Sequence, residues 1–415
     1  MNKLQPQHAK RNYIWQVLTV FIGFLVFGFS ENIRGPAIPR IQTDFNLSEM
    51  QIGTLLSLNS LGYLLACSFT AILVRKWGVK ATSLLAFGSM AVSGIFIFFS
   101  NNYPVLSGSY FFMYIGNGML EIALAILGAQ IFVKNTGTMM NLSHFFYGLS
   151  STVAPMIASG LMTVTVSGYT LDWRGMYLVM LMLSVIPMIP ALMARFPDKE
   201  IQEEERVPVK ALVRDPVIWL LVLILSFGVV SELAVGGWLV NFLEKAYSWN
   251  TDSAARMLSA FFLCFTLARL LIGPITDRIG FTLSLIILAG FTAICTTAAI
   301  VLGEPGAILF AIAGAGIAPV YPTIMAFVAK RYGRNSDTAI TFIVTLMGIG
   351  SVIGNYLIGA IIEGIKAAVS SSYESDLALL RGLQSGYGFI ALCALLCSLF
   401  SFIMYRYLKK RNALL

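Results

Sequence analysis

The residues whose types could support chemistry lie inside segments of the chain that are otherwise apolar. Between residues 114 and 155, two long apolar segments hold one carboxylate, Glu121, and a polar group formed by Asn141, His144 and Tyr147. A carboxylate in an apolar helix costs about 2.5–3.5 kcal/mol and normally faces a partner or a water-filled cavity. Burial favours the neutral carboxyl and a nearby cation favours the carboxylate, so Glu121 is predicted to bind and release a proton. The alternative is a structural hydrogen bond or ion pair between helices.

The polar group of the second segment has helical spacing. Asn141, His144 and Tyr147 are three residues apart, which places them on one face of a helix. Asparagine and tyrosine can donate hydrogen bonds to hydroxyl groups and accept from them, and histidine can do so in a pH-dependent way. We predict that Asn141 and Tyr147 bind substrate and that His144 takes part in proton coupling; the alternative is hydrogen bonding between helices. No second histidine lies near His144, so we expect no metal site.

The first apolar segment ends in SENIRGPAIPRI, which contains a second candidate site. Glu31 and Arg34 are three residues apart and can pair on one helix face. Gly35, Pro36 and Pro39 are expected to break the helix, which is tolerated at membrane depth only where the backbone is buried or lines a cavity. We predict that Glu31 and Arg34 bind substrate, and Arg34 makes an anionic sugar such as a sugar acid a candidate. The alternative is mutual neutralisation near the outer interface.

The second half of the chain supplies further candidates. Glu232 could make a polar contact or couple a proton, and Trp238, six residues on, could stack against a sugar ring. The alternatives are a gating or packing pair for Glu232, and ordinary packing for Trp238, since tryptophan is common at membrane interfaces. Asn241, Tyr321 and Asn355 are the remaining polar residues that we predict to contact substrate.

The composition indicates how these residues are positioned. Of the 415 residues, 57% are hydrophobic and 12% are charged, whereas soluble domains are about 45–50% apolar and about 25% charged. This deviation favours a protein that crosses a membrane several times. The net charge is +8, but the basic residues lie between apolar runs, which is typical of membrane topology rather than nucleic-acid binding. No GxxxxGK[ST] motif and no recognisable hydrolase site is present, so we predict a protein that is not an enzyme and has no cofactor.

The apolar runs predict twelve transmembrane helices, because a span needs about 20 apolar residues. They lie at 13–35, 50–74, 80–99, 104–133, 141–165, 174–195, 216–245, 252–274, 282–302, 304–330, 336–366 and 383–408. A hydrophilic stretch near the middle predicts an N-terminal six-helix bundle (1–195), a cytoplasmic linker (196–215) and a C-terminal six-helix bundle (216–415). Lys and Arg concentrate in the segments of one side, which predicts that both termini are cytoplasmic.

A short motif recurs at the same place in both halves. The connection after the second span, AILVRKWGVK, and the one after the eighth, GPITDRIGFT, each have a basic residue two positions before a glycine. The second copy resembles the loop signature of the major facilitator superfamily, and Arg75 stands in the first copy where that signature has an acid. The resemblance implies a gating role for Arg75, Asp277 and Arg278, and a place for Arg269 in a cytoplasmic charge network.

Four further stretches resemble the fucose-galactose-glucose:proton symporter family within that superfamily. They are GNGMLEIA around Glu121, MNLSHFFYGL around His144, SELAVGGW around Glu232, and APVYPTIM around Tyr321. The resemblance implies an all-helical membrane protein of twelve spans in two six-helix pseudo-repeats. It also implies proton-coupled uptake of a sugar, or a related polyol or sugar acid, by alternating access, with Glu121 as a proton and substrate site. The sequence departs from the family at Gly35, where the sugar-transporting members carry an acid.

Two other functions remain compatible with the same fold. A proton-driven exporter of drugs or metabolites is the main alternative, because an acid within the membrane also suits cationic amphiphiles and the apolar segments are rich in Phe and Met. The third is a nutrient sensor that has kept the fold without transport. The expected partners are a small sugar-like molecule, protons and the lipid bilayer of the plasma membrane; we expect a monomer.

Overall fold

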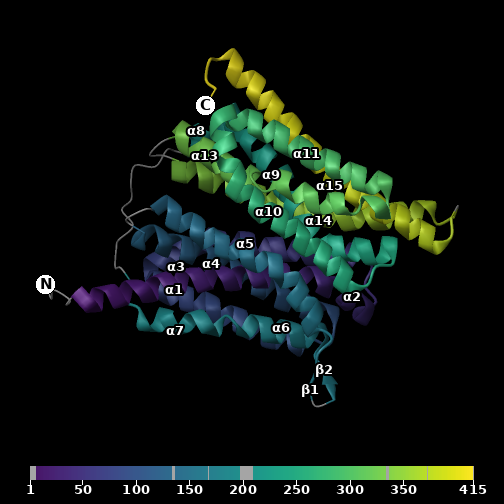
Figure 1. The fold of residues 1–415 in the computed structure, drawn as a ribbon, viewed down its shortest axis with the longest axis horizontal. Helices are drawn as coiled ribbons and strands as arrows, with labels where there is room; N and C mark the ends of the chain where they lie inside the picture. The colour runs from purple at the N-terminus through teal and green to yellow at the C-terminus, as the bar shows by residue number, and fades with distance from the viewer. Residues whose placement is uncertain are drawn as a thin grey trace. The chain divides into compact units, whose positions relative to one another are not determined.

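Nearly all of the described chain is helical, because a backbone in lipid must satisfy its polar groups within its own segment. The computed structural model describes residues 6–132, 136–166, 168–196, 209–332, 336–371 and 373–414. In chain order (Figure 1), the helices are α1 (Pro6–Asn32), α2 (Arg34–Phe45), α3 (Glu49–Phe98), α4 (Tyr103–Ile131), α5 (Thr136–Leu161), α6 (Asp172–Met182), α7 (Val185–Met193), α8 (Val209–Val213), α9 (Pro216–Tyr247), α10 (Thr251–Ile279), α11 (Phe281–Leu302), the 3-10 helix η1 (Glu304–Gly306), α12 (Ile308–Ile317), α13 (Val320–Tyr332), α14 (Ser336–Val369) and α15 (Ser375–Lys410). Strands β1 (Thr165–Val166) and β2 (Tyr169–Thr170) form an antiparallel hairpin.

The lengths of these helices agree with membrane crossing. Among the residues that the structure describes, eleven helices are long and apolar enough to span a membrane. The predicted span at 141–165 corresponds to α5, which is helical but is not one of these eleven. Most of the predicted linker, residues 197–208, lies outside the described residues.

Two glycines turn the chain at the recurring motif. Gly78 has φ 81° and ψ 161° inside α3, and Gly280 has φ 90° and ψ 151° between α10 and α11. This backbone region is essentially restricted to glycine, which explains why each copy of the motif has a glycine there. α3 therefore consists of two helices joined at Gly78, in agreement with the separate predicted spans at 50–74 and 80–99.

Three predicted spans are interrupted. The first breaks at Ile33, one turn before Pro36, whose missing N–H leaves the carbonyl oxygen of Asn32 without its helical donor. The expected break of the helix is therefore present, although Gly35, Pro36 and Pro39 themselves lie inside α2. Pro36 is the third residue of α2, where a missing N–H costs no intrahelical hydrogen bond. The predicted spans 174–195 and 304–330 are divided between α6 and α7, and among η1, α12 and α13.

The chain forms two compact units. The first unit comprises Met1–Ala37 and Leu58–Gln202, and the second comprises Ile38–Ser57 and Glu203–Leu415. The second unit therefore includes a segment from the first half of the sequence, which a division at the central hydrophilic stretch does not anticipate.

Each unit has its own core. In the first unit α1 packs against α4, α5 and α7, around buried rings that include Phe24 and Tyr114. In the second unit α9 packs against α10, α14 and α15. The ring of Phe242 on α9 lies 4.4 Å from that of Tyr387 on α15, measured between centroids. These cores hold the polar side chains of each unit in place.

Candidate functional site

Glu121 lies on α4 in the first unit and is hydrogen-bonded to α3. The hydroxyl of Tyr63 donates to Oε2 of Glu121. Gly118, nearly one turn before Glu121, permits this contact, because a Cβ atom there would lie 2.8 Å from both the Cβ of Ala66 and the carbonyl oxygen of Tyr63. Glu121 is half-buried. A protonatable carboxyl is thus held at a defined place in the middle of a membrane-spanning helix.

The predicted face of α5 lies against α1. The ring of His144 is 5.0 Å from that of Phe24, and the ring of Tyr147 is 5.2 Å from that of Phe27, measured between centroids. His144 is exposed and Tyr147 is half-buried in the described chain. The side chain of Asn141 lies outside the described part of the structure. Two of the three predicted residues therefore share one face, in contact with aromatic rings of α1.

Glu31 and Arg34 form the pair that their spacing predicts. Nη1 of Arg34 lies 3.0 Å from Oε1 of Glu31 and donates to the hydroxyl of Tyr114 at 3.0 Å. Asn117 donates to Oε2 of Glu31 at 3.4 Å and accepts a hydrogen bond from Ser30. Arg34 is 4% exposed and Glu31 7% exposed. The two charges therefore compensate each other inside the first unit.

Glu232 in the second unit has a cationic neighbour. Nη2 of Arg269 on α10 lies 3.9 Å from Oε1 of Glu232 on α9. The guanidinium of Arg269 stacks over the ring of Phe265 at 4.3 Å. The structure thus brings together two residues that sequence analysis placed in different roles, one in proton coupling and one in a cytoplasmic charge network.

Arg269 also supports the break between α12 and α13. Its Nε donates to the carbonyl oxygen of Ala318 at 3.1 Å. In a regular helix this carbonyl would accept from the residue four positions later, which is Pro322 and has no N–H. One guanidinium therefore serves both the acid on α9 and the backbone beside Tyr321.

The other residues of the second unit that were predicted to contact substrate differ in how deeply they are buried. Trp238 is buried, and its indole N–H has no hydrogen-bond partner within the described residues. Tyr321 is half-buried on α13. Asn355 is buried on α14 and donates to the carbonyl oxygen of Ser351 at 3.2 Å.

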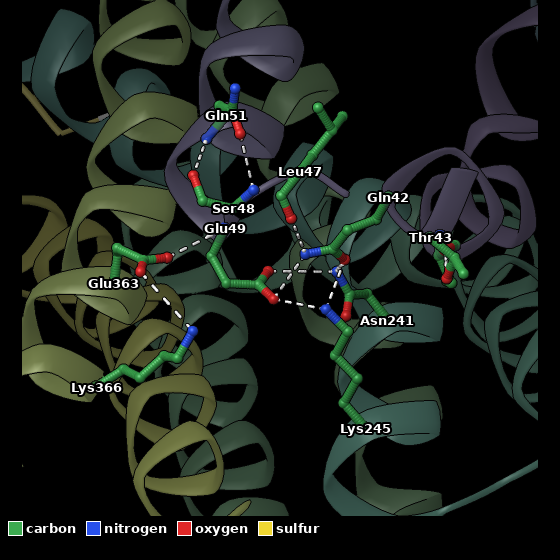
Figure 2. Close-up of polar contacts among 11 residues, drawn as sticks. Gln42, Thr43, Leu47, Ser48, Glu49, Gln51, Asn241, Lys245, Glu363 and Lys366 are labelled. Carbon is green, nitrogen blue, oxygen red and sulfur yellow. Dashed lines mark hydrogen bonds and ion pairs between the residues drawn. The ribbon is translucent and has the colours of Figure 1, made fainter. Parts of the chain in front are cut away.

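Asn241 belongs to a cluster that sequence analysis missed. Its amide donates to Oε1 of Gln42 at 3.1 Å and to Oε2 of Glu49 at 3.5 Å, and Lys245 completes the group (Figure 2). Gln42 and Glu49 come from the segment Ile38–Ser57 of the second unit. No local pattern in the sequence pairs these residues, because the two parts of the cluster are about 200 residues apart in the chain.

The predicted gating residues lie at the recurring motif. Arg75 on α3 and Arg278 on α10 are both exposed, close to Gly78 and Gly280. The side chain of Asp277 is outside the part of the chain that the structure describes. Their role in gating stays a prediction.

An acid at the start of α9 forms a polar group that sequence analysis also missed. Asp215 caps the helix, because its Oδ1 accepts from the backbone N–H of Val217 at 2.9 Å. Its Oδ2 accepts from the hydroxyl of Tyr332 at 2.6 Å and from Arg331 at 3.3 Å. Burial alone would raise the pKa of Asp215, but these hydrogen bonds and the charge of Arg331 hold its pKa below the ordinary value. The signal in the sequence was an N-cap aspartate followed by a proline.

We expect Asp215→Asn to lower the free energy of unfolding by about 1 kcal/mol at neutral pH, because asparagine still caps the helix but carries no charge. Since the folded pKa is below the unfolded value of about 4, the charge stabilises the protein above that pH and the stabilisation is lost as pH falls through the folded pKa. Thermal unfolding of purified protein at pH 7 and at about pH 3 measures this difference. The matched control is Asp252→Asn, which removes an exposed helical acid. A difference that stays constant between the two pH values would contradict the assignment.

The sequence of this chain is similar to a known protein family and to individual proteins. The chain matches the family described as the Major Facilitator Superfamily over residues 20–355 and 230–414. It is 24% identical over 300 residues to Bypass of stop codon protein 6 of Saccharomyces cerevisiae, a match that covers 63% of this chain and 57% of the yeast protein. It is also 24% identical to an uncharacterized MFS-type transporter of Yersinia pestis, over 86% of this chain and 91% of that protein.

Solved structures with the same fold cover nearly the whole chain. A bacterial homolog of the human lysosomal transporter Spinster matches with a TM-score of 0.77 at 15% identity, covering 96% of this chain and 98% of that one. A D-xylose-proton symporter matches with a TM-score of 0.77 at 14% identity over 94% and 97%. The fucose:proton symporter of E. coli matches with a TM-score of 0.62 at 17% identity over 95% and 99%. These likenesses confirm the predicted all-helical membrane fold.

Proposed function

Because this chain belongs to the major facilitator superfamily of membrane transporters, we propose that it couples proton movement to the uptake of a sugar or a related polyol. Superfamily members carry small molecules across the lipid bilayer, and they are not enzymes. The coupling ion, the substrate class and the direction of transport are the proposed part.

The hydrogen-bonded carboxyl of Glu121 carries the proposal. A carboxyl that is half-buried in a membrane-spanning helix can exist in the charged form only with compensating partners, and the hydroxyl of Tyr63 is such a partner. A change in hydration as access alternates between the two sides would shift the balance between the charged and neutral forms. Glu121 can therefore take up a proton on one side and release it on the other.

The pair of Glu232 and Arg269 supports a coupling role for the second unit. The 3.9 Å contact between Glu232 and Arg269 is a looser ion pair than the 3.0 Å contact between Glu31 and Arg34. Arg269 also fixes the backbone beside Tyr321, so movement of Glu232 would be transmitted to α13. His144, exposed on α5, remains a proposed member of the same coupling system.

The proposed substrate is neutral, because the cationic side chain of Arg34 already has an anionic partner within the protein. Arg34 lies against Glu31 and Tyr114, so it supports a neutral sugar or polyol over a sugar acid. Within the first unit, Tyr147 is the proposed hydrogen-bonding partner of substrate hydroxyl groups, and within the second unit it is Tyr321; both side chains are half-buried. The resemblance to sugar-proton symporters described above points the same way.

The proposal is tested by measuring internal pH in proteoliposomes while single sugars are added outside without an imposed gradient. We expect one neutral sugar or polyol to acidify the interior, because proton entry accompanies its uptake. Protein-free liposomes and liposomes treated with a protonophore are the controls. A response to sugar acids alone would overturn the neutral-substrate assignment.

An unchanged internal pH would also be informative. If neither neutral sugars nor sugar acids change the internal pH, while purified protein remains folded, the proposal of proton-coupled sugar uptake is wrong. Proton-driven release of preloaded lipophilic cations would then identify the protein as an exporter.

We also propose a location and an assembly for the transporter. The concentration of Lys and Arg on one side supports cytoplasmic termini, and the plasma membrane is the proposed location. The segregation of polar candidates into the two units of one chain supports a monomer.

A further inference from the structure

Asn59 is a buried polar residue near the middle of a membrane-spanning part of α3. The span covers Glu49–Thr70, and Asn59, which belongs to the first unit, is 0% exposed. Within the described residues, neither the oxygen nor the nitrogen of its side-chain amide has a hydrogen-bond partner. An asparagine amide can donate two hydrogen bonds and accept two. The protein therefore holds an amide inside the membrane without using its hydrogen-bonding capacity for its own structure.

Asn32, another buried asparagine of the first unit, shows the ordinary arrangement. It is 2% exposed, and its amide donates to the carbonyl oxygen of Gly28 and to the hydroxyl of Ser151, both at 2.9 Å. Buried polar groups are nearly always paired in this way, because an unpaired one has given up its hydrogen bonds to water for nothing. Asn59 departs from this rule where an apolar side chain would suit the surroundings better. Such a departure points to a ligand.

Asn59 lies one helical turn before Tyr63, the residue that holds Glu121. Residues four apart share one face of a helix, and the hydroxyl of Tyr63 donates to Glu121. The same part of α3 packs directly against α4, since a Cβ atom at Gly62 would lie 2.6 Å from the carbonyl oxygen of Phe111. The amide of Asn59 and the protonatable carboxyl of Glu121 therefore belong to one polar stretch of the first unit.

The chemistry of the amide favours a neutral ligand that carries hydroxyl groups. A hydroxyl both donates and accepts a hydrogen bond, and an asparagine amide can satisfy both needs at once. The amide has no charge, so it gives no advantage to an anion or to a cation. A lipophilic cation in the same place would leave the amide as unsatisfied as it is in the empty protein.

We propose that Asn59 is a substrate-binding residue whose side-chain amide hydrogen-bonds a hydroxyl group of the transported sugar or polyol. This inference rests on the proposed transport function and deepens it, because it adds a specificity contact on the face of α3 that carries Tyr63. The empty protein is destabilised by the unpaired amide, and binding of the hydroxyl removes that destabilisation. Stability and affinity should therefore respond to changes at Asn59 in opposite directions.

The first part of the test is the melting temperature of purified, ligand-free protein in detergent. Asn59→Leu replaces the amide by an apolar group of the same branched shape. We expect the melting temperature to rise by about 2 °C or more, because a buried polar group without partners is removed. The matched control is Asn32→Leu, which should lower the melting temperature, because it leaves the hydrogen-bond partners of Asn32 unsatisfied.

The second part is isothermal titration calorimetry with a panel of neutral hexoses, pentoses and their alditols. We expect the panel member that binds the parent most tightly to bind Asn59→Leu and Asn59→Ala at least about tenfold more weakly, because hydrogen bonds to its hydroxyl are lost. The alanine variant adds no bulk, so it separates this loss from blockage by leucine. For one monodeoxy form of the same sugar, the loss of affinity seen in the parent should disappear in Asn59→Ala.

The proposal is overturned if Asn59→Leu lowers the melting temperature as Asn32→Leu does, because the amide then has a structural partner such as a bound water molecule. It is also overturned if Asn59→Ala binds the sugar with the affinity of the parent, and that result leaves proton-coupled sugar uptake intact. A parent protein that binds no member of the panel removes the sugar assignment and this inference together. The two failures are thus distinguished by whether the parent binds.

Discussion

Glu121→Gln is expected to abolish proton entry driven by sugar while leaving the protein folded. Glutamine can still accept a hydrogen bond from Tyr63, but it cannot bind or release a proton. Sugar-driven acidification of proteoliposomes should fall at least about tenfold, because an ionisable group within the membrane is the proposed proton carrier. Exchange of labelled sugar across the membrane without a gradient should change far less, because exchange needs no net proton movement.

The matched control for this result is Glu374→Gln, which removes an exposed acid that makes no capping hydrogen bond at the start of α15. It should leave both acidification and exchange at the parent level. Unchanged acidification in Glu121→Gln would refute the proton-carrier role. Loss of both activities together would instead assign Glu121 to substrate binding.

Arg34→Met is expected to cause the largest loss of stability. The change leaves Glu31 buried without its cation and takes a donor from Tyr114. Removing one partner of such a pair costs about 3–5 kcal/mol. Thermal or denaturant unfolding in detergent measures the loss.

The double change Glu31→Gln with Arg34→Met provides the comparison, because it removes both charges and leaves a neutral group beside Asn117. It should be clearly more stable than Arg34→Met alone. If Arg34→Met is as stable as the parent and mainly weakens binding of sugar acids, Arg34 belongs to a substrate site and the neutral-substrate proposal fails.

The positions of most helices could be predicted from the sequence because lipid leaves a span few options. An apolar run of about 20 residues must satisfy its backbone internally, and a helix does so. The predicted span 216–245 corresponds to Pro216–Tyr247, with Asp215 as its cap. Likewise, the motif that recurs in the two halves has a glycine at the same place in each copy, and Gly78 and Gly280 have nearly the same backbone angles.

The interruptions within spans could not be predicted in the same way. The break at Ile33 lies before Gly35 and Pro36 rather than at them. Proline near the start of a helix is compatible with that helix, so its presence does not say on which side of it the break lies. After the break, Arg34 contacts both Glu31 and Tyr114.

Whether a contact between candidate residues could be predicted depends on how far apart the two residues lie in the sequence. Glu31 and Arg34 are three apart, so helical geometry alone predicts their pairing. Tyr63 and Glu121 are separated by 58 positions, and Glu49 and Lys245 by 196. Such partners are set by which helices become neighbours, and neither hydrophobic period nor composition contains that information.

The place of Ile38–Ser57 in the second unit has a consequence for biogenesis. This segment is synthesised early, but its partners on α9 and α14 emerge from the ribosome much later. Until then, the Glu49 carboxylate and the bare backbone at Gly53 lack the neighbours that cover them in the finished protein. The segment Ile38–Ser57 therefore reaches the neighbours that it has in the structure only after α14 has been synthesised.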